Sequence, residues 1–340
     1  MIRGRFAPSP TGMLHLGNAR TALLAWLHAR AAGGAFVMRV EDLDPGRVRP
    51  GLMEAQLEDL RWLGLDWDEG PDVGGTFGPY VQTERTARFD HALRRLAALG
   101  RLFACVCTRR DLAAAASAPH GAGDEGPRYP GTCRARRIDA SDGALTADGG
   151  SPVALRYRVE PGEVCFADLL QGRTCFDPAA DAGDFVVRRK DGVAAYQLAV
   201  VVDDAAMEIT DVVRGADLLP STARQILIYR DLGLPVPRFL HVPLLLGPDG
   251  ERLAKRHGAV SLADARATGI AAERVVGWLA ATCGLAEPGE EMAARDLVAR
   301  WDVSRLPTGP TTVDAESIAR LLGETGTRAQ RGAAAGAGRP

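Results

Sequence analysis

The first forty residues alternate between strand, loop, helix and strand, and this order constrains the fold more than any other feature of the chain. We predict a strand over residues 4–7, an irregular loop over 8–12, a helix over 18–31 and a second strand over 35–40. A strand–helix–strand unit of this kind requires a parallel sheet, whose ligands bind beyond the carboxyl ends of the strands. Glu41 directly follows the second strand, at the edge where such ligands lie.

The regular alternation breaks in the middle of the chain and then returns. Thr83 is a candidate N-cap for an amphipathic helix that ends at Gly100. Beyond it, we predict strand-like segments over 153–159, 184–188, 194–202, 208–214 and 242–246, and helices over 221–232, 272–283 and 315–322. The predicted organisation is a first half of an α/β domain (1–100), an inserted module (101–183), the second half of that domain (184–260), a short helical part (261–325) and a disordered tail (326–340).

Composition excludes few functions but does exclude a membrane-spanning protein. Hydrophobic residues make up 46% of the 340 residues and charged residues 25%, and no apolar run reaches the roughly 18 residues that a membrane helix needs. The amino-terminal residues lack the apolar core of an export signal. We therefore expect a cytoplasmic protein, independent of membranes, that is a monomer. The net charge of −2 does not exclude nucleic acid, because basic residues can cluster locally.

Two polar segments can bind phosphate. His15, Gly17 and Asn18 lie at the start of the first predicted helix, where free backbone N–H groups and the helix dipole favour an anion, although a histidine there can equally be a cap or a surface residue. Lys255 is one of only two lysines among 41 basic residues and follows a Gly-Pro-Asp-Gly turn. Its ammonium can neutralise the charge of a reacting phosphate, while the alternative is a solvated basic loop.

Three ordered motifs resemble the class I aminoacyl-tRNA synthetases of the glutamyl type. They are RFAPSPTGMLHLGNA near the start, AYQLAVVVDDA in the middle and LLGPDGERLAKRHGA. In this resemblance HLGN corresponds to the "HIGH" signature and RLAKR to the "KMSKS" signature, in which Arg252 and Ala254 replace the usual lysine and serine. The resemblance covers residues 3–300 and implies a split Rossmann-like catalytic domain with an inserted module.

The resemblance implies an adenylate-forming ligase that uses ATP with Mg²⁺. His15, Asn18 and Lys255 would be catalytic, and the same three residues with Gly17 would bind ATP. Only 84 residues follow Arg256, too few for the anticodon-reading domain of the full-length enzymes, so the short branch of the family is the closer match. That branch attaches L-glutamate to queuosine in the anticodon loop of tRNA(Asp). The alternatives are a reduced synthetase that charges a tRNA 3′ end and a non-catalytic RNA-binding relative.

Glutamate carries two carboxylates and one ammonium, so its pocket needs arginine and an acid. The resemblance implies that eight residues contact it: Arg5, Phe6, Ala7, Pro8, Ser9, Glu41, Tyr196 and Arg214. Without the resemblance, Arg5 and Glu41 would be read as an ion pair across adjacent strand ends and Tyr196 as a core residue.

The cysteines indicate a metal site more than disulfides. Cys105 and Cys107, followed by Tyr129 and Cys133, match by resemblance a structural zinc site of three thiolates and a tyrosine oxygen. His120 is a rival fourth ligand, and buried thiols are the alternative without a metal. A reduced compartment argues against disulfides, so Cys165, Cys175 and Cys283 are interpreted as core residues.

Two further groups have open roles. Asp203 and Asp204 follow the strand predicted over 194–202 and would contact Mg²⁺, ribose or tRNA, or else begin a helix as its N-cap and first-turn acid. Two basic clusters are candidates for RNA phosphates, although exposed arginines are the commoner case: Arg134, Arg136 and Arg137 in one, and Arg188, Arg189 and Lys190 in the other.

Overall fold

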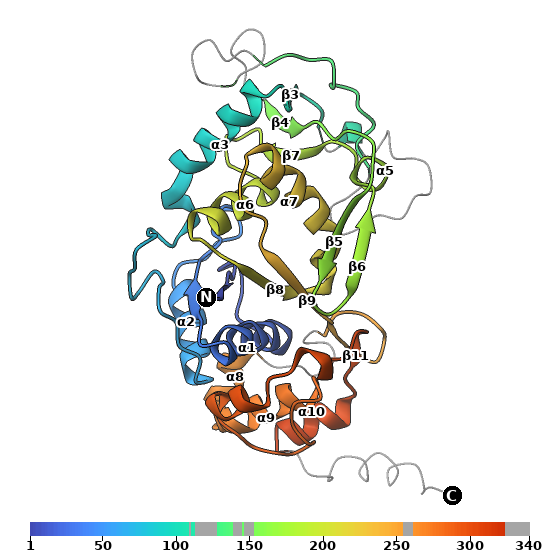
Figure 1. The fold of residues 1–340 in the computed structure, drawn as a ribbon. Coiled ribbons are helices and arrows are strands. Elements are labelled where there is room, and N and C mark those ends of the chain that lie inside the picture. The colour runs from blue at the N-terminus through green and yellow to red at the C-terminus, as the bar shows by residue number, and fades with distance from the viewer. Residues whose placement is uncertain (109, 113–127, 139–144, 146–152, 254–260, 324–340) are drawn as a thin grey trace, which may run out of the picture.

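The structure is a computed structural model that describes residues 1–323 except 109, 113–127, 139–144, 146–152 and 254–260. In Figure 1 the parallel strands lie near the middle, the inserted segments at one end and the carboxyl-terminal helices at the other. The predicted disordered tail falls outside the described residues. Among the described residues, no helix has the length and apolar character that crossing a membrane requires.

The amino-terminal strand–helix–strand unit is present as predicted. β1 (Arg3–Phe6) and β2 (Ala35–Met38) pair in parallel, with Arg3 opposite Ala35, and α1 (Leu16–Ala31) connects them. Its leucines Leu23, Leu24 and Leu27 are at most 1% exposed. Because helices cover α1 on the side away from the strands, it is buried along nearly its whole length. α2 (Leu52–Trp62), which the sequence analysis did not predict, follows β2.

The second half of the sheet is built from β8 (Asp211–Gly215) and β9 (Arg238–Val242), which run parallel. α7 (Leu219–Asp231) connects them, and its bounds agree with the predicted helix over 221–232. β8 lies beside β1, since the backbone N–H of Thr210 donates to the carbonyl of Arg3 over 3.0 Å. The two halves of the α/β domain therefore meet at β1 and β8, although 200 residues separate them in the chain.

The prediction of a strand over 194–202 is wrong. These residues lie mainly in α6 (Tyr196–Ala206), which packs against α7 and against α3 (Thr86–Ala98). The residues from Leu198 to Val202 are all buried, so the segment has no polar face and no helical periodicity. A fully buried helix rich in valine has the same apolar pattern as a buried strand, which explains the error.

The strands of the inserted region belong to two sheets. β3 (Leu102–Cys105), β4 (Ala154–Tyr157) and β7 (Phe185–Arg188) form an antiparallel sheet, whereas the hairpin of β5 (Val164–Asp168) and β6 (Gly172–Phe176) joins β9 through β5. α5 (Pro178–Asp181) follows the hairpin. The hairpin therefore belongs to the insertion by its place in the chain and to the catalytic sheet by its pairing.

Thr83 is not the N-cap of the helix that precedes the insertion. It lies in a 3₁₀ turn (Gln82–Arg85), and α3 (Thr86–Ala98) begins three residues later. Its backbone N–H and its hydroxyl both donate to the Asp42 carboxylate, over 2.8 and 2.6 Å. This side chain therefore ties α3 to the loop after β2. Gly100, with a φ of 70°, follows the helix end as predicted.

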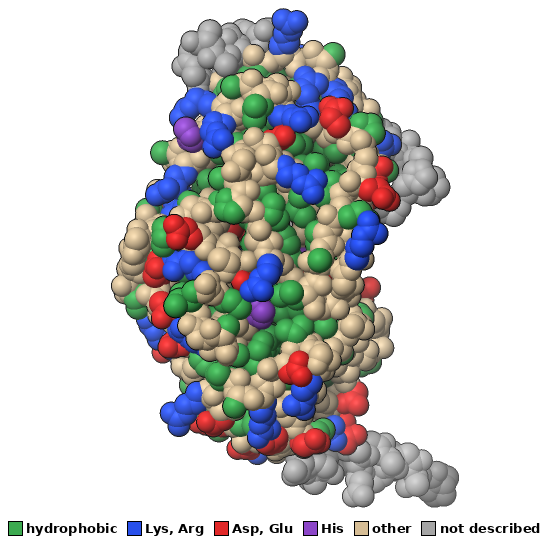
Figure 2. Space-filling model, in the orientation of Figure 1, with side chains coloured by type: hydrophobic (Ala, Val, Ile, Leu, Met, Phe, Trp, Pro, Cys, Tyr) green, Lys and Arg blue, Asp and Glu red, His purple; other side chains and the backbone are tan. Residues whose placement is uncertain are grey.

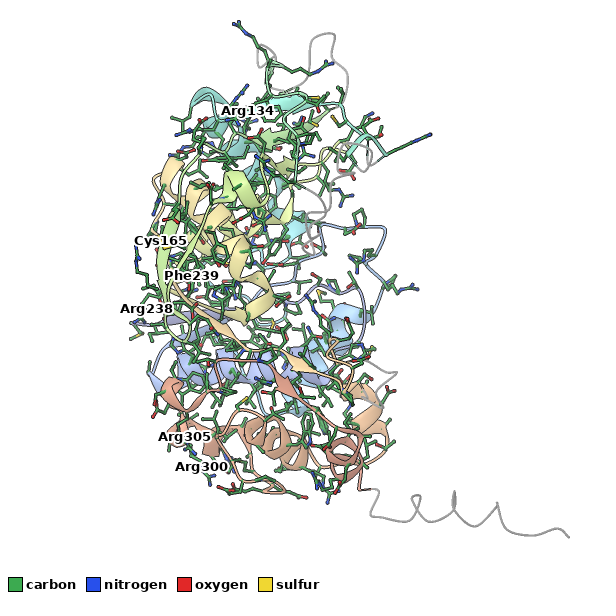
Figure 3. The ribbon with its side chains drawn as sticks, turned by 90° about the vertical axis from the view of Figure 1, so that its right-hand side faces the viewer. Arg134, Cys165, Arg238, Phe239, Arg300 and Arg305 are labelled. Carbon is green, nitrogen blue, oxygen red and sulfur yellow. A yellow bond between two sulfur atoms is a disulfide. The ribbon has the colours of Figure 1, made fainter. Side chains whose placement is uncertain are left out.

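The carboxyl-terminal part packs against α1 and extends the core at that end. It contains α8 (Leu262–Ala267), α9 (Ala272–Ala281), α10 (Ala315–Leu321) and the 3₁₀ turns Ala294–Arg300 and Val303–Arg305. Its short strand β11 (Thr311–Thr312) pairs in parallel with β10 (Leu245–Leu246), which precedes this part in the chain. Figure 3 shows Arg300 and Arg305 at this end, opposite Arg134 of the insertion. Cys283, which follows α9, is fully buried as predicted.

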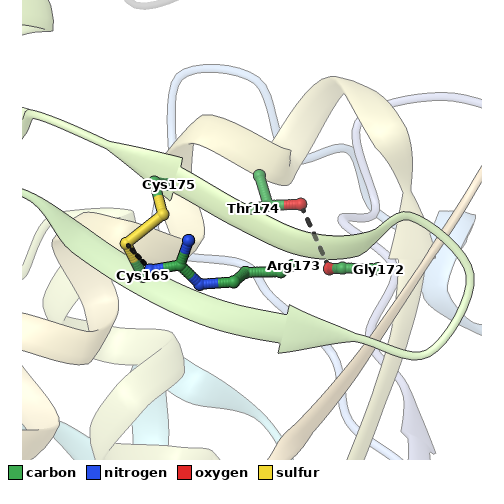
Figure 4. Close-up of a disulfide and its surroundings, with 5 residues drawn as sticks. All are labelled: Cys165, Gly172, Arg173, Thr174 and Cys175. Carbon is green, nitrogen blue, oxygen red and sulfur yellow. Dashed lines mark hydrogen bonds between the residues drawn. A yellow bond between two sulfur atoms is a disulfide. The ribbon is translucent and has the colours of Figure 1, made fainter.

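Two of the cysteines interpreted as core residues instead form a disulfide. Cys165 of β5 and Cys175 of β6 lie directly opposite each other in the hairpin, with Cα atoms 4.1 Å apart, and their sulfurs are bonded (Figure 4). Both side chains are partly exposed. The interpretation failed because it rested on the expected redox compartment and did not consider that a ten-residue spacing across a hairpin turn places two cysteines face to face.

Candidate functional site

The histidine motif and the end of the basic loop meet in space. His15 forms an isolated antiparallel bridge with Ser261, and the backbone N–H of Leu262 donates to the carbonyl of Leu14 over 2.9 Å. Ser261 is the first described residue after 254–260, so Lys255 itself lies outside the described residues. The segment that follows the basic loop therefore lies against the histidine motif at the start of α1, although about 245 residues separate the two in the chain.

The start of α1 is open to an anion. His15 occupies the N-cap position with extended backbone, and the first turn carries no acidic side chain. A Cβ built on Gly17 would meet no atom of the described residues within 4 Å, and Asn18 is exposed. A phosphate can therefore approach the helix N-terminus, where the backbone N–H groups and the dipole favour negative charge.

Buried charges line the carboxyl ends of β1 and β2. Asp204 accepts from Arg39 Nη1 over 2.6 Å and from Arg5 Nε over 3.3 Å, and Arg39 Nη2 also donates to Glu41 over 3.1 Å. Arg5, Arg39 and Asp204 are each at most 5% exposed. The ion pair of Arg5 with Glu41 considered from the sequence does not form. Instead Arg39 pairs with Glu41, and Arg5 pairs with an aspartate of α6.

The alternative in which Asp203 and Asp204 begin a helix, as its N-cap and first-turn acid, is wrong. Both residues lie inside α6 and are buried. Asp203 accepts from Arg85 Nε over 2.5 Å and from Gln82 Nε2 over 2.8 Å. These carboxylates therefore neutralise buried arginines, because an unpaired charge in the core would be costly.

The two carboxyls nearest the sheet edge respond differently to this environment. Burial by itself would raise the pKa of Asp204, but the positive charges of Arg39 and Arg5 outweigh it and lower that pKa. For Glu41, burial outweighs Arg39 and Arg5, so its pKa is raised. Asp204 therefore serves as the fixed counter-charge of the cluster. A bound ammonium beside Glu41 would favour its charged form.

The segment from Arg5 to Ser9 runs alongside the residues that follow β2. The N–H of Arg39 donates to the Phe6 carbonyl over 3.0 Å, and that of Glu41 donates to the Pro8 carbonyl over 2.9 Å. The Phe6 side chain packs in the core, whereas Ser9 is exposed. This segment can therefore offer backbone groups and Ser9 to a ligand, while Phe6 contributes packing.

Arg214 and Tyr196 face each other beside this cluster. Arg214, on β8, places Nη1 3.4 Å from the Tyr196 hydroxyl, at the start of α6. Burial raises the pKa of Tyr196, so its hydroxyl stays protonated and can donate. Arg214 is 4% exposed, yet no carboxylate is bonded to it among the described residues. Its charge is instead held by neutral partners on Thr222 and His241.

The sequence analysis missed the residues that support this pocket, namely Arg39, Asp168, Thr222 and His241. Their partners are distant in the chain, and each residue alone looks like an ordinary strand or helix position. Asp168 was the easiest of the four to predict from sequence, since a carboxylate at the end of a strand before a turn commonly caps that turn. That signal is correct but incomplete, because Asp168 also bonds to His241.

The predicted zinc ligands lie together beside the β3–β4–β7 sheet. Cys107 Sγ lies 3.5 Å from Cys133 Sγ, and the Tyr129 hydroxyl lies 3.7 Å from Cys105 Sγ and 3.9 Å from Cys107 Sγ. A tetrahedral zinc ion with bonds of about 2.3 Å to sulfur and 2.0–2.2 Å to oxygen separates its ligands by about 3.5–3.8 Å. The four side chains therefore fit such an ion. His120, the rival ligand, lies outside the described residues.

The surroundings of this cluster also suit a cation bound by thiolates. Burial and the neighbouring thiols raise the pKa of Cys107 to about 11, whereas for Cys133 hydrogen bonds outweigh burial and lower the pKa to about 7. Arg156 stacks on the Tyr129 ring with its guanidinium carbon 3.8 Å from the ring centre, and its Nε donates to Cys105 Sγ over 3.4 Å. The arginine can offset the negative charge that three thiolates and a phenolate would leave around a dication.

The fold and the two converging motifs define a class I tRNA synthetase. A model of the class I tRNA synthetases of the glutamyl and glutaminyl type, catalytic domain, matches residues 1–319. The chain belongs to this family.

Individual relatives are similar over nearly the whole chain. The chain is 58% identical to the glutamyl-Q tRNA(Asp) synthetase of Symbiobacterium thermophilum, over 96% of this chain and 100% of that protein. It is 49% identical to the protein of the same name in Nitratidesulfovibrio vulgaris, over 94% and 98%. Among solved structures, the glutamate–tRNA synthetase of Elizabethkingia anophelis matches 94% of this chain and 69% of its own, with a TM-score of 0.78 and 27% identity.

Proposed function

We propose that the protein activates L-glutamate with ATP and transfers it to queuosine in the anticodon loop of tRNA(Asp). The observation that carries the proposal is the meeting of the HLGN turn with the residue that ends the basic loop. In this family those two segments enclose the ATP phosphates. The relatives named glutamyl-Q tRNA(Asp) synthetase, which match over their own whole length, support the choice of tRNA(Asp).

In the first step the glutamate α-carboxylate attacks the α-phosphorus of ATP and expels pyrophosphate. His15, the N–H groups at the start of α1 and Asn18 hold the phosphates, and Gly17 leaves them room. Lys255 stabilises the charge that builds on the leaving pyrophosphate. Mg²⁺ supplies further neutralisation of the phosphates when it is bound with ATP. The protein forms no covalent bond in this step.

In the second step a hydroxyl of queuosine attacks the activated carboxyl carbon, and AMP leaves. Glutamate stays oriented between Glu41, which takes the ammonium, and Arg214 with Tyr196, which take a carboxylate. Arg5 and Arg39 are already paired with Asp204, so they set the potential of the pocket more than they bind directly.

We further propose that Cys105, Cys107, Tyr129 and Cys133 hold one structural zinc ion. All four positions are filled by the protein, which leaves no open position for catalysis. The ion would fix the inserted region, and Arg134, Arg136 and Arg137 in that region are candidates for contacts with RNA phosphates, as are Arg188, Arg189 and Lys190.

Hydrophobic side chains are visible along the middle of the face shown in Figure 2, with lysine and arginine side chains around them.

The deciding experiment locates the transferred glutamate. Bulk tRNA is charged with radioactive glutamate by the protein, digested with nuclease and separated. We expect label in the anticodon loop of tRNA(Asp), absent from tRNA without queuosine and labile to mild alkali as an ester. Label on the 3′ adenosine of tRNA(Glu) would instead make the protein a glutamate–tRNA ligase, the activity named for its structural neighbours. Gel filtration of the same preparation tests whether the protein is a monomer.

A further inference from the structure

A buried histidine links a carboxylate to the arginine of the proposed glutamate pocket. His241 on β9 lies directly opposite Arg214 on β8, and its Nε2 accepts from Arg214 Nε over 3.1 Å. Its other ring nitrogen, Nδ1, lies 2.6 Å from Asp168 Oδ2. His241 is fully buried and Asp168 is 4% exposed. The three side chains form a chain from β5 through β9 to β8. Figure 3 places Cys165, of the same strand β5, near Phe239 of β9.

The hydrogen bonds fix the protonation of the ring. Because an arginine Nε always carries a hydrogen, His241 Nε2 must be the acceptor, and Nδ1–H must donate to Asp168. Burial lowers the pKa of His241, and the charge of Arg214 lowers it further against the opposing effect of Asp168, so the ring is neutral at pH 7. A second hydrogen on Nε2 would point at the guanidinium and remove its acceptor.

Asp168 is well placed to select this tautomer. Its Oδ1 accepts from the backbone N–H groups of Leu170 and Gln171 over 3.0 and 2.9 Å, and its Oδ2 also accepts from the backbone N–H of His241 over 3.1 Å. Both oxygens therefore face only donors, which a carboxylate satisfies and a side-chain amide does not. The carboxylate is held rigidly with respect to both strands.

On the other side, the guanidinium is held at two of its three nitrogens. Nε bonds to His241, and Nη2 donates to Thr222 Oγ1 over 2.7 Å. Among the residues that the structure describes, the remaining Nη1 contacts only the Tyr196 hydroxyl, over 3.4 Å. This arrangement orients the guanidinium plane before a ligand arrives and leaves Nη1 able to bind a carboxylate. A fixed donor loses less entropy on binding than a free one.

We propose that Asp168 and His241 are positioning residues that orient Arg214 to bind a carboxylate of the amino acid. The inference rests on the proposed function, because it takes Arg214 as a ligand of glutamate. Asp168 and His241 do not touch the substrate and act through the arginine. Their loss should therefore weaken amino-acid binding and leave ATP binding unchanged.

The primary test is Asp168→Asn, measured by exchange of pyrophosphate into ATP. The side-chain amide must point its NH₂ group either at the backbone N–H groups of Leu170 and Gln171 or at the His241 ring. In the second case the ring hydrogen of His241 moves to Nε2, where it faces the Nε–H of Arg214. We expect the KM for glutamate to rise at least tenfold, while kcat and the KM for ATP change less than threefold. The reason is that the contact with the glutamate carboxylate stabilises the bound substrate and the transition state equally. An unchanged KM for glutamate overturns the proposal.

A second pair of variants separates positioning from folding. His241→Gln offers Arg214 a carbonyl acceptor near the position of Nε2, whereas His241→Leu offers none. We expect the glutamine variant to keep a KM for glutamate several-fold lower than that of the leucine variant. Equal KM values in variants that both remain folded overturn the proposal. Phe166→Leu is the matched control, because its ring packs 6.4 Å from that of His241 without any polar link to Arg214. It should lower stability and leave that KM unchanged.

The pH profile gives an independent measurement. The charged groups that act on His241 are Asp168 on β5, Arg214 on β8 and, from β1, Arg5. Thr222 of α7 and the rings of Phe166 and Phe239 complete its surroundings. Glu41, whose pKa is raised, causes a fall in kcat/KM for glutamate at acid pH in both proteins. In the wild type the protonation of His241 should steepen this fall, and the glutamine variant should lose that additional part only. An equally steep fall in both proteins counts against the proposal.

The outcomes also separate this inference from the proposed function. If the wild type shows no glutamate-dependent exchange, or Arg214→Ala leaves the KM for glutamate unchanged, the proposed function or its pocket is wrong. If both behave as expected and the Asp168 and His241 variants do not, only the positioning role is wrong.

Discussion

Replacing Asp204 by Asn should destabilise the protein strongly, because this carboxylate holds two buried arginines. Arg39 Nη1 lies 2.6 Å from it and Arg5 Nε 3.3 Å, in a part of the core that water does not reach. Asparagine keeps the shape of the side chain but removes the charge. The positive charges of Arg5 and Arg39 would then repel each other without the negative charge that lies between them in the wild type.

The magnitude follows from the partners that remain. Breaking a buried pair by removing one partner costs about 3–5 kcal/mol. Arg39 would keep Glu41 at 3.1 Å and Asp203 at 3.9 Å. Among the described residues, Arg5 would keep only its hydrogen bond to the Val213 carbonyl, at 3.2 Å. We therefore expect about 3 kcal/mol, the lower end of that range, and a fall in Tm of about 4 °C for a chain of 340 residues.

The assay is thermal and urea unfolding followed by circular dichroism, with Glu316→Gln as the control. Glu316 pairs with Arg320 on the surface of α10, where both side chains are more than 60% exposed, and its loss should change stability by less than about 0.5 kcal/mol. The pKa of Asp204 is lower in the folded protein than in the unfolded chain, where it is about 3.9. The stabilising contribution of Asp204 is therefore complete above the unfolded value and disappears as the pH falls through the folded value. The difference between Asp204→Asn and wild type should therefore be constant from pH 8 to pH 5. A loss no larger than that of the surface control would refute the reasoning.

Three further outcomes are expected. The purified protein should contain about one zinc ion per chain by elemental analysis, and Cys133→Ser should lower transfer to RNA more than glutamate activation; equal loss of both steps contradicts this separation. Lys255→Ala should slow pyrophosphate exchange by ~10² or more with little change in glutamate affinity, and a rate within threefold of wild type would make the lysine incidental. Burial raises the pKa of Asp59 to about 6 despite Arg266, 3.6 Å away, so the native carboxyl resists ionisation and the protein loses stability as the pH rises from about 4 to 6. Asp59→Asn should therefore raise Tm at pH 8 but not at pH 4, and an equal shift at both values would exclude this cause.

The parts of the fold that were predictable from sequence are those set by local pattern. The strand–helix–strand unit, α7, α9 and α10 all have clear periodicity or end signals, and the structure has them within a few residues of the predicted bounds. α6 was mistaken for a strand because it is buried on every side. A continuous apolar segment indicates that the residues are buried, but a helix without a polar face has no 3.6-residue periodicity that would distinguish it from a buried strand.

The candidate site was predictable only where a residue carries its own signal. His15, Gly17 and the cysteine cluster belong to motifs with fixed spacing. The support of the pocket has no such signal, since Asp204 pairs with Arg39 across 165 residues and His241 with Asp168 across 73. Which arginine meets which carboxylate depends on strand register and helix placement, and these follow from the packing of the whole domain.

The pairing of β5 with β9 has a mechanical consequence for the proposed reaction. Asp168 is the last residue of β5, and it bonds to the backbone and the ring of His241 on β9, which in turn holds Arg214. The other strand of the same hairpin is tied to β5 by the disulfide of Cys165 and Cys175, and the insertion continues from it toward β7. A displacement of the hairpin would therefore move the carboxylate that selects the tautomer of His241. If RNA binds to the insertion as proposed, these contacts connect the bound RNA to the arginine of the proposed amino-acid pocket.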